Sequence, residues 1–318
     1  MFNLGEAIPF DDKANDVLTV GELLVDMISN EYGDAFESNG YTRFFGGSPS
    51  NIAINVNKLG IRSQVASAVG RDGLGDFLVK GLQRAGIDTS GVQRVDESTS
   101  MVVITKSQQT PIPIFYRGAD SELVYNDALE QALIHSKIVH FSCWPISRVP
   151  SRYTVERVIG IARKHKLLIG FDPNYHPLIW QKGEDGVSYV KSIIPKVDII
   201  KPSEDDAERL FGPGTPAEQV GRFLELGAKL VVMTLGKEGA MVSNGIETLT
   251  YGTKATEIED TTGAGDAFWS GFYAAVVKGY TLNEAMELGF AVSAYKLKFM
   301  GAVVNLPTLE EIKQQFNL

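Results

Sequence analysis

The stretch Asp260-Thr-Thr-Gly-Ala-Gly-Asp-Ala-Phe268 carries the strongest local signal in the 318-residue chain. Gly263 and Gly265 allow backbone conformations that other residues resist, so that consecutive N–H groups can converge on one anion. The apolar run from Ala267 to Val277 indicates a helix, and its positive N-terminal end would point at the same place. The stretch therefore predicts a phosphate site at the start of a helix.

Asp266 follows this turn directly, and a carboxylate beside an anion site does not serve anion binding. It could instead take a proton from a hydroxyl that attacks the bound phosphate. On spacing alone, a glycine-rich turn whose Asp266 only caps the helix is equally open. The stretch also nearly matches GxGxxG, but Phe268 stands where the third glycine of a dinucleotide site belongs. A P-loop is not indicated, because Gly236-Lys237 is followed by Glu238.

Strand and helix patterns alternate outward from this stretch. A strand is expected at 18–26, and Ser48 as N-cap with Pro49 as the first helical residue opens a helix that ends at Gly60. Further strands are expected at 64–69, 137–142, 167–171, 197–200, 229–234 and 239–243, and further helices at 74–86, 151–165, 186–194, 203–211, 216–227, 265–277 and 282–299. Thr281 and Glu284 predict a capping box for the last helix. Repeated βα units imply a mostly parallel sheet covered on both faces, with ligands at the carboxyl ends of its strands.

The pattern changes between Ser98 and Tyr116, where short strands at 101–105 and 112–116 are separated by a polar turn without a helix. Together, the segments near 30–45 and 98–120 predict a small β lid over the ligand site. We expect one domain over residues 17–318, preceded by a loosely ordered tail over residues 1–16. Open β insertions leave sheet edges that need covering, so a homodimer paired through the lid is expected.

Composition limits the function classes. The chain is 44% hydrophobic and 22% charged, which excludes disorder, collagen-like repetition and coiled coil. Its net charge is 30 − 39 = −9, so no nucleic acid or membrane partner is expected, although a local basic cleft for phosphates remains open. The N-terminus does not resemble a signal peptide and no long apolar run predicts a membrane span. Cys143 is the single cysteine and the four histidines have no zinc-ligand spacing, so the expectation is a cytoplasmic protein without tightly bound zinc.

Two signatures resemble those of the ribokinase-like (PfkB) carbohydrate kinases. The stretch from Asp260 to Asp266 is similar to their C-terminal signature, and Gly46-Gly-Ser-Pro-Ser-Asn-Ile-Ala53 to their N-terminal one. With Gly21-Glu-Leu-Leu-Val-Asp26 and Thr234-Leu-Gly-Lys-Glu-Gly239, the resemblance extends over residues 18–308. It implies a three-layer α/β/α ribokinase-like fold with a mostly parallel central sheet and a β-sheet lid. It also implies ATP-dependent phosphorylation of a sugar hydroxyl.

The resemblance implies roles for individual residues. Asp266 would be the general base, and the backbone amides of Gly263, Ala264 and Gly265 would form the anion hole. The sugar would be held by Asp26, Gly46, Gly47, Asn51, Arg117 and Asn174. ATP would be bound by Lys201, Ser203, Thr234, Gly236 and Gly239. Mg²⁺ would accompany ATP, with Asp206 reaching it through water, and Asp260 and Thr262 match positions that bind a monovalent cation, so activation by K⁺ is expected.

The chemistry of these side chains fits a polyol, with plainer alternatives beside each. Asp26, expected at the C-terminal end of a strand, can accept two hydroxyls, and Asn51 offers a donor and acceptors. The plainer alternative for Asp26 is an exposed strand-end carboxylate, and for Asn51 it is solvation of the first turn of its helix. Arg117 on the lid ribbon could reach the substrate or be a solvated strand-edge arginine.

Three segments indicate the sugar. Gly21-Glu22, the segment 114–120 and the segment 171–180 resemble fructokinases and 2-keto-3-deoxygluconate kinases more than ribokinases or adenosine kinases. His176 stands where the family commonly has an arginine, and His cannot reproduce the rigid fork with which Arg binds a carboxylate. We therefore expect D-fructose, giving fructose 6-phosphate, as the first acceptor and 2-keto-3-deoxygluconate as the second.

Ser203 and Asp206 depart from the Asn-x-x-Glu usual in relatives. Ser-x-x-Asp is typical of a helix cap, to which a magnesium-water role could be added. Two other functions remain open: a nucleoside or vitamin kinase of the same fold, and a sugar-binding regulator without catalysis. A regulator could lose Asp266 or the glycines, yet all of them are present.

Overall fold

A computed structural model describes residues 2–33, 38–106 and 113–318. Its nine-stranded sheet has the order β13 (Thr248–Tyr251), β12 (Ala240–Ser243), β11 (Leu230–Thr234), β10 (Ile199–Ile200), β9 (Leu168–Asp172), β8 (Ser136–Ser142), β1 (Asn15–Val20), β4 (Ser63–Gly70) and β5 (Val92–Val95). Neighbouring strands from β5 to β11 pair in parallel, while β12 and β13 are antiparallel. The predicted, mostly parallel sheet is confirmed.

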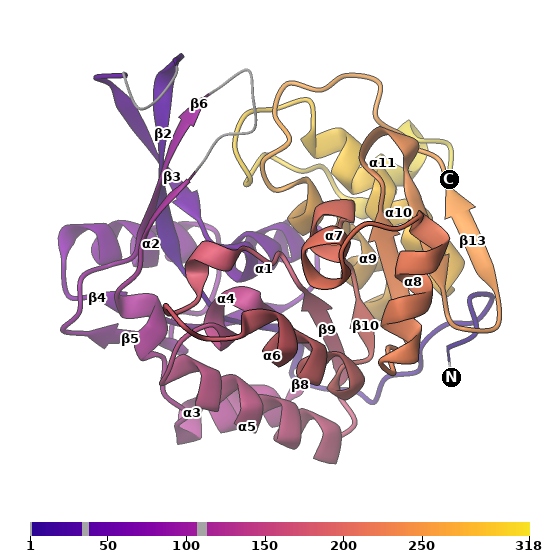
Figure 1. The fold of residues 1–318 in the computed structure, drawn as a ribbon, viewed down its shortest axis with the longest axis horizontal. Coiled ribbons are helices and arrows are strands. Elements are labelled where there is room, and N and C mark those ends of the chain that lie inside the picture. Colours follow the sequence, from indigo (N-terminus) through magenta and orange to yellow (C-terminus); the bar gives the residue numbers. More distant parts are fainter. Residues whose placement is uncertain (1, 34–37, 107–112) are drawn as a thin grey trace.

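Helices cover both faces of this sheet because its strands alternate apolar side chains between two cores (Figure 1). Val17 of β1 belongs to one core and Leu18 to the other. One core includes residues of α3 (Asp127–Ile134), α5 (Ser151–Lys164), α6 (Gly186–Ile193), α7 (Glu204–Phe211) and α8 (Pro216–Glu225). The other includes residues of α1 (Ser48–Lys58), α9 (Ala264–Val277), α10 (Leu282–Lys296) and α11 (Leu309–Gln315). The predicted three-layer α/β/α arrangement is confirmed.

A second, four-stranded sheet forms the lid, which projects from the body in Figure 1. Its order is β3 (Tyr41–Gly46), β2 (Leu24–Tyr32), β6 (Met101–Lys106) and β7 (Ile114–Tyr116). The strands β2 and β6 pair in parallel, and the two outer pairings are antiparallel. The predicted β lid is confirmed, but the polar turn between its last two strands lies outside the described residues.

The strand predicted at 18–26 is two strands, β1 and β2, which belong to different sheets. The chain leaves the central sheet at Gly21, whose φ is 150° and whose missing Cβ makes room for Pro49 and Pro145. It then enters β2 of the lid. Asp26 is therefore the third residue of β2, and the expectation that it ends a strand at the C-terminal side is wrong.

One face of the lid packs against a hydrophobic core of the body. Val25 of β2 lies in this core with Leu78 and Leu82 of α2 (Gly73–Arg84), and Met27 lies against it. Because side chains alternate along a strand, Asp26 lies on the opposite face of the lid. Asp26 therefore faces away from this core and is close enough to Asp266 to feel its charge.

Two further expectations are wrong. Residues 2–14 are not a loose tail: Leu4 is buried, and Leu4 and Glu6 accept backbone hydrogen bonds from the start of α10. Ser48 is not the N-cap of α1, because Gly47 occupies that position and Ser48 is the first helical residue. The predicted capping box of Thr281 with Glu284 is confirmed. Among the helices of the described residues, none is long and apolar enough to cross a membrane.

Candidate active site

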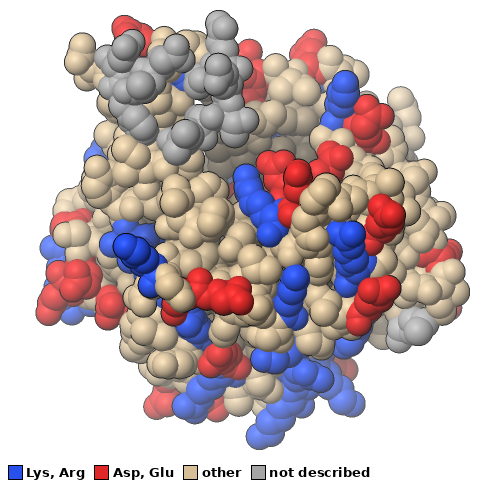
Figure 2. Space-filling model, in the orientation of Figure 1, with Lys and Arg blue, Asp and Glu red and all other residues tan. Residues whose placement is uncertain are grey.

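The carboxyl ends of the parallel strands meet the start of α9 at one edge of the sheet. Ser142 ends β8, Asp172 ends β9, Lys201 follows β10 and Thr234 ends β11. The Nε1 of Trp269 on α9 donates to Asp172 Oδ2 over 2.9 Å, so α9 is fixed at this edge. The surface is hollowed beside the lid, and acidic and basic side chains line the margin of the recess (Figure 2). This is the edge at which parallel α/β sheets bind ligands.

Asp266 lies in the first turn of α9 and is held by the first turns of α1. Ser48 Oγ donates to its Oδ1 over 2.6 Å, and Asn51 Nδ2 donates to its Oδ2 over 2.9 Å. Pro49 and the shift of the cap to Gly47 place Ser48 inside the helix, where its hydroxyl points at α9 instead of capping α1. The side chain of Asp266 is therefore fixed in orientation before any ligand binds.

Burial raises the pKa of Asp266 to about 6, although the hydrogen bonds from Ser48 and Asn51 lower it. Asp172 raises the pKa further, and Lys201 lowers it. Asp266 is thus ionised at neutral pH and more basic than an exposed aspartate. These are the properties of a general base that works near neutrality.

Asp26 reaches toward Asp266 from the lid. Burial at the recess and the charge of Asp266 raise the pKa of Asp26 to about 7. Asp26 accepts no hydrogen bond from any residue that the structure describes. A Cβ on Gly46 would overlap the Asp26 carboxylate, so the glycine makes room for it. The structure thus brings these predicted sugar residues together around Asp266.

Two more predicted sugar residues lie in the same recess. Gly47 has a φ of 103°, and a Cβ there would clash with the Glu22 backbone carbonyl. Asn51 uses its amide nitrogen to orient Asp266, whereas its Oδ1 is buried without a partner among the described residues. An unpaired buried acceptor is costly, and a sugar hydroxyl would satisfy it.

Glu22 is a third carboxylate in this cluster and was not predicted as a site residue. It is buried, and it accepts hydrogen bonds from the Ser48 amide and the Ser142 hydroxyl, both at 3.2 Å. Burial raises its pKa to about 8. Glu22 therefore links the start of α1 to the end of β8 and holds the Ser48 backbone in place.

The anion site at the start of α9 is partly as predicted. Gly263 has a φ of 74°, and a Cβ there would also clash with Ala302. The amides of Gly263 and Gly265 donate to no residue in the described part of the chain, but the Ala264 amide donates to the Thr261 carbonyl over 3.1 Å. Of the three amides predicted to form an anion hole, Ala264 is thus already paired, and the role of Gly263 and Gly265 stays a prediction.

Lys201 adds a positive charge to this anion site. Its Nζ would lie 3.2 Å from a Cβ placed on Gly265, and it forms an ion pair of 2.9 Å with Asp172 Oδ2. Both partners are buried. Asp172 thus orients the ammonium toward the start of α9, and the predicted binding of ATP by Lys201 stays a prediction.

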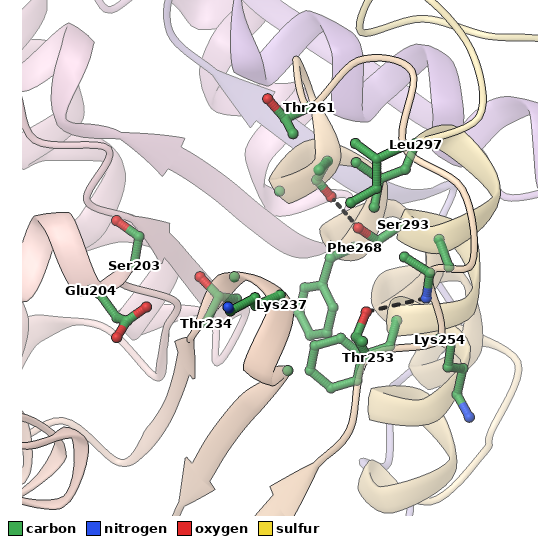
Figure 3. Close-up of a pocket in the computed structure, with 18 of the residues that line it drawn as sticks. Ser203, Glu204, Thr234, Lys237, Thr253, Lys254, Thr261, Phe268, Ser293 and Leu297 are labelled. Atoms are coloured by element: carbon green, nitrogen blue, oxygen red, sulfur yellow. Dashed lines mark hydrogen bonds between the residues drawn. The ribbon is translucent and has the colours of Figure 1, made fainter. Parts of the chain in front are cut away.

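A cavity of about 440 Å³ opens beside the anion site (Figure 3). The predicted residues Ser203, Thr234, Gly236 and Gly239 line it together with Gly265. Its apolar wall was not predicted and consists of Ile258, Phe268, Phe290, Ala294 and Leu297. A flat apolar base would fit this wall while its phosphates reach Gly265.

Asp206 is a helix cap and a poor ligand for Mg²⁺. Its Oδ2 accepts from both the amide and the hydroxyl of Ser203, and its Oδ1 accepts from the Tyr175 amide. Burial and Asp172 raise its pKa. The predicted capping box is confirmed, and the proposed water-mediated role of Asp206 is not supported. Glu204 is exposed and lines the cavity instead.

The position predicted for a monovalent cation already has a positive charge. Lys296 Nζ donates to the backbone carbonyl of Asp260 over 2.7 Å. The Asp260 carboxylate accepts from the amides of Thr262 and Gly301. The carbonyl and carboxylate oxygens of Asp260 thus already accept hydrogen bonds within the protein, while the cation role of Thr262 stays a prediction.

Arg117 is held inside the protein. Its side chain is 1% exposed, pairs with Asp120, stacks on the Trp144 ring at 4.4 Å and donates to Ser147. The alternative of a solvated strand-edge arginine is therefore wrong, and contact of Arg117 with the sugar stays a prediction. Arg117 follows β7 of the lid directly and ties the end of that strand to α4 (Cys143–Ile146).

Two residues that follow β9, Asn174 and His176, lie at the margin of the site. Asn174 has a φ of 39° and is exposed. His176 packs edge-on against Phe115 of the lid at 5.2 Å, and burial lowers its pKa. His176 therefore contacts the lid, and the sugar-binding role of Asn174 stays a prediction.

The sequence and the fold have close counterparts in known proteins. The model of the pfkB family carbohydrate kinases matches residues 14–309. A 6-phosphofructokinase of Thermoanaerobacterium thermosaccharolyticum, described as ATP-dependent, is 60% identical over 100% of this chain and 99% of its own length. The structure of Halothermothrix orenii fructokinase has a TM-score of 0.79 at 41% identity, covering 86% of this chain and 97% of that one.

A putative ribokinase II of E. coli, solved with ATP and Mg²⁺, has a TM-score of 0.81 at 25% identity and covers 95% of this chain and 99% of that one. The chain belongs to the pfkB family of carbohydrate kinases. It is an ATP-dependent sugar kinase with the ribokinase-like fold, as the sequence resemblance implied.

Proposed function

We propose that the chain transfers the γ-phosphoryl group of ATP to a hydroxyl of a fructose-series sugar, with fructose 6-phosphate as the principal acceptor. The observation that carries the chemistry is the Asp266 carboxylate, which Ser48 and Asn51 hold beside the amides of Gly263 and Gly265, two donors without a partner among the described residues. A base and an anion site on one helical turn suit a hydroxyl that attacks a phosphate.

In the proposed reaction Asp266 accepts the proton of the attacking hydroxyl as the oxygen–phosphorus bond forms. The bond from the γ-phosphorus to ADP breaks, and the proton later passes from Asp266 to solvent. The amides of Gly263 and Gly265 and the ammonium of Lys201 lie where negative charge gathers on the phosphoryl oxygens. Asp26 and Asn51 Oδ1 would accept hydrogen bonds from other sugar hydroxyls.

Mg²⁺ would accompany the nucleotide, and carboxylate oxygens are its usual protein partners. Glu204 fits this requirement, because it is exposed and lines the cavity (Figure 3). When bound, Mg²⁺ would neutralise part of the phosphate charge. Lys201 and the start of α9 provide the remaining positive field.

The acceptor is inferred from the relatives together with the charge of the recess. The relative that is 60% identical over the whole chain is a 6-phosphofructokinase, and such identity favours a shared acceptor. The carboxylates Asp26, Glu22 and Asp266 cluster where hydroxyls would bind. The group that binds beside these carboxylates should therefore be uncharged. Fructose 6-phosphate can place its C1 hydroxyl there, because its phosphate is on C6, the carbon farthest from C1.

Free fructose is the second candidate, supported by the fructokinase structure at 41% identity and by the segments quoted from the sequence. 2-Keto-3-deoxygluconate, the second acceptor expected from the sequence, carries its carboxylate at the end of the chain opposite its C6 hydroxyl, so the acidic cluster alone does not separate it from fructose 6-phosphate. A coupled ADP assay with saturating MgATP should compare these three acceptors with ribose and adenosine.

We expect kcat/KM for fructose 6-phosphate to exceed that for fructose by about tenfold or more, a difference of about 1.4 kcal/mol in transition-state binding. Phosphorus NMR of the product should show a bisphosphate. The opposite preference would establish fructose as the acceptor, and a sugar acid ahead of both would overturn the fructose series. Normal ATP binding without turnover on any sugar would indicate a regulator instead of a kinase.

We also propose that two lids pair in a homodimer. Edge strand β7 exposes 39% of Ile114 and 51% of Tyr116, and an uncovered edge strand offers unpaired backbone groups to a second strand. Sedimentation velocity at micromolar concentration should give the mass of a dimer. A monomer at that concentration would remove the pairing and leave the kinase chemistry intact.

A further inference from the structure

Lys296, the last residue of α10, is completely buried although it carries an ammonium group. Such a charge needs oxygen partners to offset the loss of water. Its Nζ donates to the backbone carbonyl of Asp260 over 2.7 Å, and the Asp260 Oδ2 atom lies 3.9 Å away. Asp260 is the first residue of the stretch that leads to Asp266. The ammonium therefore contacts the loop that forms the anion site.

The last turns of α10 hold this loop at several points. Ser293 Oγ donates to the Ala264 carbonyl over 2.9 Å, and the Glu259 amide donates to the Leu297 carbonyl over 2.8 Å. Lys296 lies between these two contacts on α10. Burial lowers the pKa of its ammonium, while the carboxylates of Asp260 and Asp266 raise it. The loop is thus clamped to α10 around one positive charge.

A resident K⁺ does not fit this arrangement. A protein-bound K⁺ replaces its water shell with carbonyl and carboxylate oxygens. At Asp260 the carbonyl oxygen already receives the Lys296 ammonium, and the carboxylate oxygens already receive the amides of Thr262 and Gly301. A second monovalent charge at contact distance from Nζ would be strongly repelled in a buried site.

We propose that the Lys296 ammonium is a built-in substitute for a monovalent cation: it holds the loop from Asp260 to Ala264 in its active geometry, so that phosphoryl transfer by this chain is independent of K⁺. The inference rests on the proposed kinase function. It replaces the expectation of K⁺ activation with a positioning role for a residue of the chain itself.

The first experiment compares the unaltered protein in chlorides of K⁺, Na⁺ and tetramethylammonium at equal ionic strength. We expect kcat to differ by less than about twofold, because nonspecific screening is then the same. A titration with Tl⁺, followed by thallium NMR, should show no ion displaced by K⁺. Activation of several-fold by K⁺ alone, or a Tl⁺ site that K⁺ empties, would overturn the proposal.

The second experiment removes the charge. Lys296→Met keeps the chain length, and kcat in tetramethylammonium chloride should fall by about tenfold or more because the anion-site loop loses its clamp. K⁺ or NH₄⁺ should restore part of the lost rate, and a Tl⁺ site should appear. Lys298→Met is the matched control, since it removes the same charge two residues away from a partly exposed position; it should change neither property.

A Lys296→Met variant with the unaltered rate in tetramethylammonium chloride would contradict the positioning role. If that variant does not fold by circular dichroism, the salt and Tl⁺ measurements on the unaltered protein still decide. If no sugar is phosphorylated at all, the proposed function fails, whereas the Tl⁺ titration continues to test whether Lys296 occupies the cation position.

Discussion

The two halves of the site handle charge in opposite ways. In the proposed function, the nucleotide half consists of the backbone amides of Gly263 and Gly265 and the ammonium of Lys201. The acceptor half consists of side-chain carboxylates, with Asp26 supplied by the lid. Asp266 stands between them. Backbone amides suit the nucleotide phosphates, which are the same for every acceptor. Side chains can be substituted without changing the fold, so the acceptor half can change its specificity.

The largest effect on kcat should come from changing Asp266, which lies between the two halves. Asp266→Asn keeps the shape of the side chain and removes the base, so kcat should fall by about 10²–10⁴-fold. The new amide can still accept from Asn51 and can donate to the Ser48 oxygen, which is 2.6 Å from Asp266 Oδ1. Steady-state kinetics should therefore be accompanied by calorimetry showing nearly unchanged ATP affinity.

Asp26→Asn is the matched control in the acceptor half, because it removes a carboxylate from the same recess. We expect it to act mainly through the KM for the sugar, by about tenfold, since a charge-assisted hydrogen bond is weakened. A kcat for Asp266→Asn above about a tenth of the unaltered value, with both ligands bound normally, would contradict the general-base assignment.

The same contrast explains which parts of the site could be predicted. The nucleotide half depends on glycines where the backbone must come close to other atoms. Gly263 and Gly265 could be recognised in the sequence by their residue type and spacing. The βα alternation likewise predicted the central sheet because apolar periodicity is local in sequence. The break at Gly21 was missed, since two strands of different sheets there form one apolar run.

The acceptor half depends on contacts between distant segments, which no local pattern encodes. Ser48 looked like a cap, yet its hydroxyl bonds a residue 218 positions away. Glu22 stood in a segment that resembles fructokinases and Lys296 gave no signal beyond its charge, and only the folded chain shows that both are buried. Arg117 pairs with Asp120, three residues on, and this ion pair could have been suspected from the sequence.

The smallest expected effect tests how the two halves are joined through Ser48. Its hydroxyl stabilises the ionised form of Asp266 and so lowers a pKa that burial holds at about 6. Ser48→Ala removes this donor, and we expect the pKa to rise by about one unit. Because the protonated carboxyl cannot act as a base, activity falls as the pH drops through this pKa. The acidic limb of the kcat/KM profile should therefore move to higher pH, while the plateau changes little.

Ser48→Thr retains the hydroxyl and is the control, so its acidic limb should stay where it is in the unaltered protein. Rates measured between pH 5 and 9 in buffers of constant ionic strength would separate the two variants. An acidic limb that does not move in Ser48→Ala would mean that another group sets it. Asp26 is the next candidate, because burial and the charge of Asp266 raise its pKa to about 7. In that case Asp26→Asn should abolish the limb that Ser48→Ala leaves in place, and the acidic lid, not the start of α9, would control the pH dependence.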